Sequence, residues 1–429
     1  MLKVKNKRIF LLQILFMLLL CYIHALTAGH TCDFSPINGT FQNFNPVRRL
    51  LSGQIPYRDF SDYLGLGHLY IGSFFTFLFG RNYQASLIAF SFLTIFSFAL
   101  LSLSIGFSIL HDRIKVFAIT NIFLVVLLQQ PAFYANGSLT GSFMKNAMNA
   151  ALTVGNSARF VRGMILPIFV FLFLMGSTYI KAKKIRKYDT LVYSASFGFL
   201  ASFAIFWSND YGISSFVCAS IGFLWCSISK WRSAKKVAVH FLVFLDAVLC
   251  GTILFGELLT AGHFGSWLKN TFGTGDFQRW YYLGGASSYV FEIDMSFLTV
   301  TQLLICFIYA YFIFISRADR KSLIRFGIPC FCNLTSYCAV NEYKLLSGGL
   351  IYEVAYSALF LTLAFEVASF LKAHLQINVR RATKLCCVAS SAICASWLAP
   401  NAFNEAFFRA TAKPANCIVE LGGGGGIFV

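Results

Sequence analysis

Charged residues are scarce in this chain of 429 residues: they make up 12% of it, while apolar residues make up 57%. Soluble globular proteins contain roughly 25% charged and roughly 45–50% apolar residues. Acidic residues are the scarcest, with 17 against 35 Lys plus Arg, so the net charge is +18. This composition excludes a soluble enzyme and a disordered chain. The positive charge does not indicate a nucleic-acid partner, because membrane proteins keep Lys and Arg in their cytoplasmic loops.

Several motifs that indicate a particular chemistry are also missing. No Walker A and no GxGxxG motif occurs, so nucleotide-driven transport and dinucleotide chemistry have no support. Most of the 13 Cys lie in apolar stretches, where free Cys acts as a small hydrophobe, and Cys330-Phe-Cys332 lacks zinc-site spacing. The glycine run 422–426 is not followed by Lys-Ser/Thr and a helix, so it predicts a flexible tail or an unusual chain end. No internal repeat is evident, which weakens a transporter built on inverted repeats.

Long apolar runs dominate what is present. A helix needs about 20 apolar residues to cross a hydrocarbon core of about 30 Å. The first run is full-length, and Leu26 spoils a small-x-small cleavage site, so we expect a retained anchor. The sequence predicts an all-α, polytopic transmembrane helix bundle of about 11 spans, at 9–28, 83–110, 116–134, 162–180, 190–208, 211–228, 237–259, 297–315, 326–341, 350–371 and 384–399.

Charge distribution decides whether the ambiguous segment 66–80 spans the membrane. If it lies in the interface, six short loops fall inside and carry 23 of the 35 basic residues; if it spans, later basic runs fall outside. The positive-inside rule therefore predicts a juxtamembrane helix at 66–80, the N-terminus inside and the C-terminus outside. We expect one integral-membrane domain, 1–429, in the bacterial inner membrane. Its first outer loop is 29–82 and its outer tail is 400–429, and most acids lie on the outer face, where we expect the activity.

The first outer loop contains the most informative sequence. Asp33 lies a few residues beyond the first span. Residues 41–51 predict a short amphipathic helix with Phe41 and Phe44 on its apolar side, and Gly53 ends it. The segment PYRDFSD, 56–62, then leads into the predicted juxtamembrane helix.

This order of features resembles the first periplasmic loop of the GT-C integral-membrane glycosyltransferases, which use lipid-linked sugars. The best matches are 50–60, LLSGQIPYRDF, and 78–80, LFG, and the likeness covers perhaps 80 residues. The resemblance implies sugar transfer from a polyprenyl phosphate in the outer leaflet. The family's usual Asp-Glu pair would fall near 38–39, where no acid stands, and its paired prolines are replaced at 64–68. Either Asp33 has taken the catalytic position through a shifted loop, or the chain is a divergent member without transferase activity.

Such a transfer needs a base for the acceptor hydroxyl and positive charge beside the leaving phosphate. We predict Asp33 as the base, with capping of the following turn as an equal alternative. Asp59 and Asp62 are candidates for binding a divalent metal or acceptor hydroxyls; the alternative is that they cap the juxtamembrane helix while Arg58 pairs locally. Arg58 and His68 are further substrate-binding candidates.

Arg159 and Arg162 are the predicted phosphate ligands, three residues apart on one helical face; snorkelling anchors are the alternative. Asp210 lies in a very short turn between two spans, where an acid is either functional or ordinary turn chemistry. Asp276 and Arg279 lie in an aromatic outer loop suited to sugars or to an interfacial belt. Lys344 completes the substrate-binding candidates.

We therefore expect a glycosyltransferase of cell-envelope polysaccharide biosynthesis. Its partners would be a polyprenyl-phosphate sugar donor, a glycan or lipid acceptor and membrane lipids, with no nucleic acid and no certain cofactor beyond a possible divalent metal. Two alternatives remain open. One is an O-antigen-type polymerase or ligase, and the other is a flippase or transporter of lipid-linked sugars.

Overall fold

The structure of the chain is a computed structural model. The described residues are 2–31, 40–62, 64–128, 158–182, 187–231, 233–272, 297–316, 319–347, 353–374, 418–421 and 425–428. They form two compact units: unit 1 comprises 1–51, 71–160 and 363–429, and unit 2 comprises 52–70 and 161–362.

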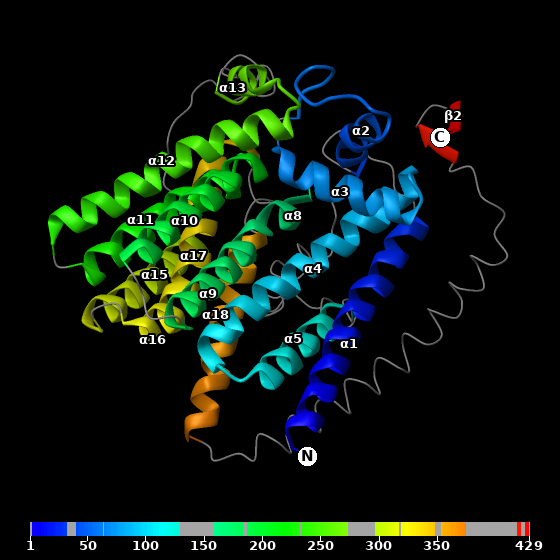
Figure 1. Cartoon of the computed structure of the whole chain (residues 1–429). Helices are drawn as coiled ribbons and strands as arrows, with labels where there is room; N and C mark the ends of the chain where they lie inside the picture. Colours follow the sequence, from blue (N-terminus) through cyan, green and yellow to red (C-terminus); the bar gives the residue numbers. More distant parts are fainter. Residues whose placement is uncertain are drawn as a thin grey trace. The chain divides into compact units, whose positions relative to one another are not determined.

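Helices make up nearly all of the described structure, which confirms the all-α prediction (Figure 1). From the N-terminus to residue 163 the helices are α1 (Leu2–Thr31), α2 (Thr40–Leu51), α3 (Leu66–Phe79), α4 (Tyr83–Leu110), α5 (Arg113–Leu128) and α8 (Arg159–Gly163). The next are α9 (Ile165–Ala182), α10 (Lys187–Trp207), α11 (Tyr211–Lys230), α12 (Ala234–Leu259) and α13 (Phe264–Phe272). The last are α15 (Phe297–Ile315), α16 (Arg320–Ser322), the π-helical turn η2 (Leu323–Gly327), α17 (Ile328–Ser347) and α18 (Glu353–His374).

Eight helices of the described part are long and apolar enough to cross a membrane, as expected of a multi-pass membrane protein. They correspond to eight of the predicted spans and cover Arg8–Leu26, Tyr83–Leu110, Thr190–Trp207, Tyr211–Ile228, Ala234–Leu259, Phe297–Ile315, Arg320–Val340 and Val354–Ala373. Two more predicted spans correspond to α5 and α9, which have 16 and 18 residues. The last predicted span, 384–399, lies outside the described residues, so eleven spans stay a prediction.

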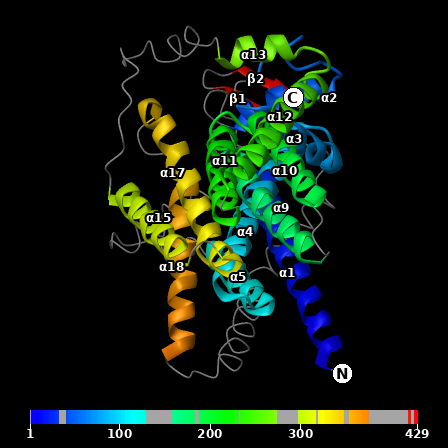
Figure 2. The ribbon, with the colours of Figure 1, turned by 60° about the vertical axis from the view of Figure 1, so that its left-hand side comes forward.

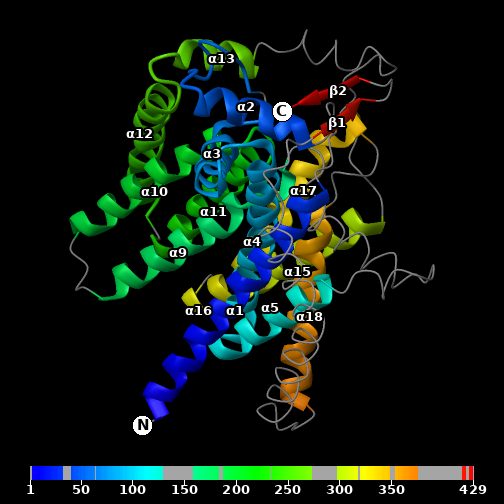
Figure 3. The same ribbon diagram turned by 90° about the vertical axis from the view of Figure 1, so that its right-hand side faces the viewer.

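In unit 1, α1 packs against α4 and α5 (Figure 3). The interface is largely apolar, with the Phe10 and Phe117 rings 5.0 Å apart, edge to face. One polar contact joins α1 to α5, because Asn121 Nδ2 donates to the Gln13 carbonyl at 3.2 Å, and another joins α4 to α5, where the Ser102 and Thr120 hydroxyls lie 2.8 Å apart. Polar side chains that bond across helices in this way fix the register of packed helices in a low-dielectric surrounding.

The predicted amphipathic helix is confirmed as α2. Its Phe44 and Val47 are buried while Arg48 is exposed, and Phe44 packs against Tyr83 of α4. The Tyr83 hydroxyl also lies 2.6 Å from the Thr40 hydroxyl. The apolar face of α2 therefore holds residues 40–51 on α4 within unit 1.

The ambiguous segment forms α3, which has 14 residues and spans about 21 Å at 1.5 Å per residue. A membrane span needs about 20 residues to cross a core of about 30 Å, so this helix is too short to span it. Gly80 follows with φ +134°, and the Asn82 side chain accepts from the Ala85 N–H at 2.7 Å to begin α4. The helix is thus as short as a juxtamembrane helix requires; its place at the interface stays a prediction.

In unit 2, α10 packs closely on α12 and forms a hairpin with α11, while α17 contacts α11 and α15 (Figures 1 and 2). A polar network joins α15, α17 and α18: Gln302 Nε2 donates to Asn333 Oδ1 at 3.2 Å, and Asn333 Nδ2 donates to Thr362 Oγ1 at 2.9 Å. All three side chains are fully buried. Unpaired amides are costly in an apolar surrounding, so this network fixes how the three helices pack.

The end of the chain departs from the sequence prediction. Strands β1 (Ile418–Leu421) and β2 (Gly425–Phe428) pair antiparallel, with Ile418 opposite Phe428. The glycine run therefore enters a β-hairpin, and the prediction of a flexible tail is wrong for the glycines of β2.

Candidate functional site

The segment between α2 and α3 folds into a compact loop within unit 2. The Tyr57 N–H donates to the Phe60 carbonyl at 2.6 Å, and the Asp59 carboxylate accepts from the Ile55 N–H at 2.8 Å. The Tyr57 hydroxyl donates to the backbone carbonyl of Asp62. These local bonds hold the loop in one shape, with Tyr57 at a φ of +65°.

Arg58 and Asp59 form an exposed pair on this loop. Arg58 Nη2 lies 2.9 Å from Asp59 Oδ2, and 49% and 30% of the two side chains are exposed. The Arg58 hydrogen bond and the Ile55 N–H lower the pKa of Asp59 to about 2. The local pairing predicted for Arg58 is confirmed. Asp59 bonds within its own loop and does not cap α3, so that alternative is wrong for Asp59.

Asp62, by contrast, is 4% exposed. Its Oδ1 accepts from the Leu64 N–H at 3.0 Å, which is the bond of an Asx turn just before α3. Its Oδ2 lies 3.7 Å from His68 Nε2, and His68 is 1% exposed. Asp62 thus caps the turn that leads into α3 through one oxygen and directs the other toward His68.

Two glycines allow the start of α3 to lie against the turn between α10 and α11. A Cβ on Gly65 would overlap the backbone of Ser208, and a Cβ on Gly67 would overlap Trp207. The Asn209 N–H donates to the Leu64 carbonyl at 3.2 Å, which joins the same two segments. The glycines at 65 and 67 therefore have a packing reason.

Trp207 joins a third segment to this contact. Its Nε1–H lies 3.2 Å from the Val161 carbonyl and 2.9 Å from the Arg162 carbonyl. These carbonyls belong to the short helix α8. The tryptophan consequently fixes Arg162 beside the turn that carries Asp210.

Arg162 and Asp210 form a buried ion pair. Arg162 Nη1 donates to Asp210 Oδ2 at 2.5 Å, and both residues are 2% exposed. The Asp210 carboxylate does not cap α11; the Ser208 hydroxyl accepts from the Gly212 N–H at 3.0 Å instead. Arg162 is buried against Asp210 and does not reach toward a surface, so the structure gives no support to snorkelling at this position.

The four side chains Asp62, His68, Arg162 and Asp210, here called the ionic cluster, influence one another electrostatically. Burial raises the pKa of Asp62 to about 7, against the opposing effects of the Leu64 N–H and the Arg162 charge. Burial, together with the Arg162 charge, lowers the pKa of His68 to about 3. His68 is therefore neutral at neutral pH, while Asp62 exchanges its proton close to that pH.

Three buried atoms of the ionic cluster have no hydrogen-bond partner among the described residues: Asp62 Oδ2, His68 Nδ1 and Asp210 Oδ1. Buried polar atoms are nearly always paired, so each exception calls for an explanation. A proton acceptor, an imidazole and a paired arginine can together bind a hydroxyl and an anionic group. The described residues hold no group of three or more His, Cys, Asp and Glu that could bind a metal ion.

The structure brings together four of the predicted site residues, namely those of the ionic cluster. Arg58 and Asp59 stay on the exposed side of their loop. Arg159 is also on α8 and is 9% exposed, but it belongs to unit 1. The predicted residues Asp33, Asp276 and Arg279 lie outside the described residues.

Lys344 corrects one predicted boundary. We expected it in an outer segment after a span ending at 341, but α17 continues to Ser347, so Lys344 lies on a helix. Its side chain lies outside the described part of the chain. Trp207, Gly65 and Gly67 were not among the predicted site residues. The sequence signal was the pair Gly65 and Gly67 at the start of an apolar helix. This spacing does not reveal that the helix packs on Trp207.

The chain matches no family model, no curated protein and no solved structure. Similarity to known proteins therefore adds nothing to the geometry of the site.

Proposed function

We propose that this chain is a membrane glycosyltransferase that transfers a sugar from a polyprenyl-phosphate donor to a glycan or lipid acceptor. The reaction would take place at the outer face of the bacterial inner membrane. The observation that carries the proposal is the ionic cluster, in which four ionisable side chains are at most 4% exposed. Buried charges are expensive in a membrane protein and mark functional sites more often than not.

Arg162 has the charge that the departing phosphate needs. An arginine held in a dry site by a carboxylate is positioned before the reaction, and it favours negative charge that develops nearby. Asp210 provides that carboxylate at 2.5 Å. Because Asp210 keeps one oxygen without a hydrogen-bond partner in the described structure, it can also accept a sugar hydroxyl.

The proton of the acceptor hydroxyl needs a base. Asp33 keeps this role as a prediction from the family resemblance. Asp62 is a second candidate because its pKa of about 7 matches the condition for efficient proton transfer at neutral pH. His68, held neutral by burial, can donate or accept a hydrogen bond beside it.

The position of the cluster favours an enzyme over a flippase. Asp210 lies between the end of α10 and the start of α11, and Arg162 lies just before α9, so both belong to helix ends. Transporters bind their cargo near the middle of the membrane, between broken helices. An O-antigen-type polymerase or ligase would also use cations at helix ends, so the identity of the acceptor distinguishes it from the proposed transferase.

Transfer of a labelled sugar from a polyprenyl phosphate, in membranes that contain the full chain, tests the proposal. Asp62→Asn preserves the shape of the side chain but removes its basicity, so we expect transfer to fall by about 10²-fold or more. Asp33→Asn tests the predicted base in the same assay. If only Asp33→Asn abolishes transfer, Asp62 serves binding and not proton transfer.

The matched control is Asp112→Asn. Asp112 lies between α4 and α5, 40% exposed, and caps the start of α5 through bonds that an amide oxygen can also accept. Transfer should be unchanged in this variant. Equal transfer by Asp62→Asn, Asp33→Asn and wild type would contradict the proposed function.

A further inference from the structure

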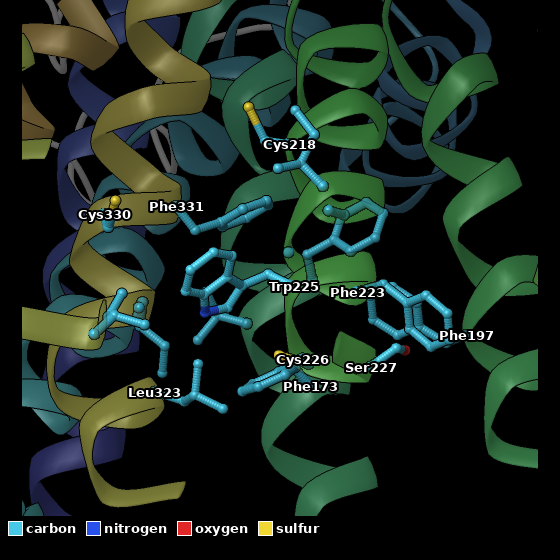
Figure 4. Close-up of a pocket in the computed structure, with 18 of the residues that line it drawn as sticks. Phe173, Phe197, Cys218, Phe223, Trp225, Cys226, Ser227, Leu323, Cys330 and Phe331 are labelled. Carbon is cyan, nitrogen blue, oxygen red and sulfur yellow. The ribbon is translucent and has the colours of Figure 1, made fainter. Parts of the chain in front are cut away.

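A cavity of ≈ 720 Å³ lies within unit 2, away from the ionic cluster (Figure 4). Helices α9, α10, α11, α12, α15 and α17 line it, together with the short elements α16 and η2. Most of the lining is aromatic or aliphatic. Its volume lies within the range of about 300–1,000 Å³ that is typical of small-molecule sites.

The cavity is elongated along α11. Its lining runs from Cys218 to Ser227, about 14 Å of helix at 1.5 Å per residue. Figure 4 shows the Trp225 ring of α11 and the Phe331 ring of α17 entering the same space from opposite sides. Gly222 of α11 also lines the cavity, and a Cβ there would meet nothing within 4 Å. An apolar space of this length suits a hydrocarbon chain.

The cavity opens on a surface that is itself apolar. Ile221 and Trp225 line it and are 59% and 38% exposed, and Val217 and Ile228 extend the same exposed row on α11. Because α11 has the length and composition of a membrane span, we expect this row to face lipid. A chain can therefore enter the cavity from the bilayer without crossing water.

One end of the cavity is polar and basic. Arg320 lines it there, and so does Trp231, over whose ring Lys236 Nζ lies at 5.3 Å. The Trp231 ring also stacks on His240 with the ring centroids 5.0 Å apart. Tryptophan beside cations is typical of the headgroup level of a membrane, and the two cations favour an anionic headgroup.

We propose that this cavity binds one acyl chain of an anionic diacyl phospholipid, with the headgroup at Arg320 and Lys236. The opposite end of these helices carries the ionic cluster, so this site is separate from the proposed transfer site. The phospholipid fills the space between α11 and α17, which would otherwise be an apolar void in a packed membrane protein.

Quenching of tryptophan fluorescence tests the site. The full chain, purified in detergent, is titrated with phosphatidylglycerol whose acyl chains are brominated, because bromine quenches a tryptophan it touches. We expect saturable quenching in the wild type and loss of that saturable component in Trp225→Phe. Quenching that rises without saturation would overturn the proposal, because it would indicate general lipid contact.

A cavity-filling substitution provides the decisive comparison. Gly222→Leu places a side chain in the open space, and we expect at least about tenfold weaker binding, or about 1.4 kcal/mol. Gly265→Leu is the matched control, since Gly265 lies on α13, outside the lining, and its Cβ also meets nothing within 4 Å. Equal binding by Gly222→Leu and Gly265→Leu would overturn the proposal. Ile221→Phe serves as a second filling variant if Gly222→Leu does not fold.

The choice of occupant is tested by competition. Brominated phosphatidylcholine should bind more weakly than phosphatidylglycerol, and Arg320→Gln should remove this difference. If polyprenyl phosphate displaces the probe at a lower concentration than unlabelled phosphatidylglycerol, the occupant is the donor lipid and the proposal is wrong.

Discussion

At the scale of single residues, we expect the ion pair between Arg162 of α8 and Asp210 of the α10–α11 turn to have the largest effect on the stability of the fold. A buried ion pair contributes little net stability, but removal of one partner leaves an uncompensated charge in an apolar surrounding. Arg162 and Asp210 are each 2% exposed, so water cannot screen the charge that remains. The pair therefore makes the start of α9 and the start of α11 dependent on each other.

A double-mutant cycle measures this dependence. We expect Arg162→Met and Asp210→Asn each to destabilise the chain by about 3–5 kcal/mol, and the double variant by clearly less than the sum. Thermal unfolding in detergent provides the measurement. The exposed pair Lys115 and Asp112, 3.5 Å apart, is the control, and its cycle should give a coupling below about 1 kcal/mol. Additive effects at Arg162 and Asp210 would show that the two residues do not interact.

The pH dependence of stability depends on Asp62 and His68, whose contributions oppose each other. The folded chain binds one proton more than the unfolded chain at Asp62 between pH 3.8 and about 7, so this group stabilises the fold as the pH falls. At His68 the unfolded chain binds one proton more than the folded chain between about pH 3 and pH 6.5, so this group destabilises the fold as the pH falls. From about pH 6.5 to 4 the two effects nearly cancel.

Single substitutions should reveal each contribution. Relative to the wild type, His68→Gln should become more stable as the pH falls from 7 to 4, and Asp62→Asn should become less stable. The difference in free energy of unfolding between variant and wild type should change by at most about 1.4 kcal/mol per pH unit, the value for one proton. Melting temperatures at several pH values measure it. Parallel curves for the two variants would contradict the pKa shifts at this site.

At the scale of elements, the start of α3 fits against the α10–α11 turn only because of its glycines. Gly67 lies within α3, and a Cβ there would overlap the Trp207 ring and backbone. The Trp207 Nε1–H in turn donates to the backbone carbonyls of Val161 and Arg162. A side chain at position 67 would therefore displace Trp207 and, with it, Arg162 of the ionic cluster.

Gly67→Ala should destabilise the chain by about 1–3 kcal/mol through overpacking. The control is Gly222→Ala, also in a helix, where the Cβ meets open space and alanine should stabilise by up to about 1 kcal/mol. Thermal melts of the two variants, side by side, separate packing from helix propensity. A stabilised Gly67→Ala variant would show that α3 does not pack on Trp207.

The elements differ in how well the sequence predicts them. Periodicity and length predicted α2, α4 and the α10–α11 hairpin, because apolar runs and Gly53 mark their limits locally. Predicting that the Arg162 charge acts on Asp62 and His68 required knowing that 52–70 packs with 161–210, and no local pattern contains that information. The sequence identified all four members of the ionic cluster as candidates, but it assigned them to separate roles.

At the scale of the whole molecule, the charge distribution predicts the direction in which the helices cross the membrane. In unit 2 the ionic cluster and the basic residues Lys236 and Arg320 lie at opposite helix ends, as expected if basic loops stay inside. A C-terminal alkaline phosphatase fusion should be active, because it works only outside, and an N-terminal fluorescent fusion should fold inside. An inactive phosphatase fused to a fully inserted chain would contradict the predicted orientation.

The central claim is that the ionic cluster is the place of sugar transfer. The most direct test is the initial rate of labelled sugar transfer from polyprenyl phosphate by purified full chain carrying Arg162→Gln. The exposed Arg113, at the start of α5, offers the matched substitution Arg113→Gln. We predict a loss of about 10²-fold for Arg162→Gln in folded protein and no change for Arg113→Gln. Equal rates for Arg162→Gln, Arg113→Gln and wild type would contradict the claim.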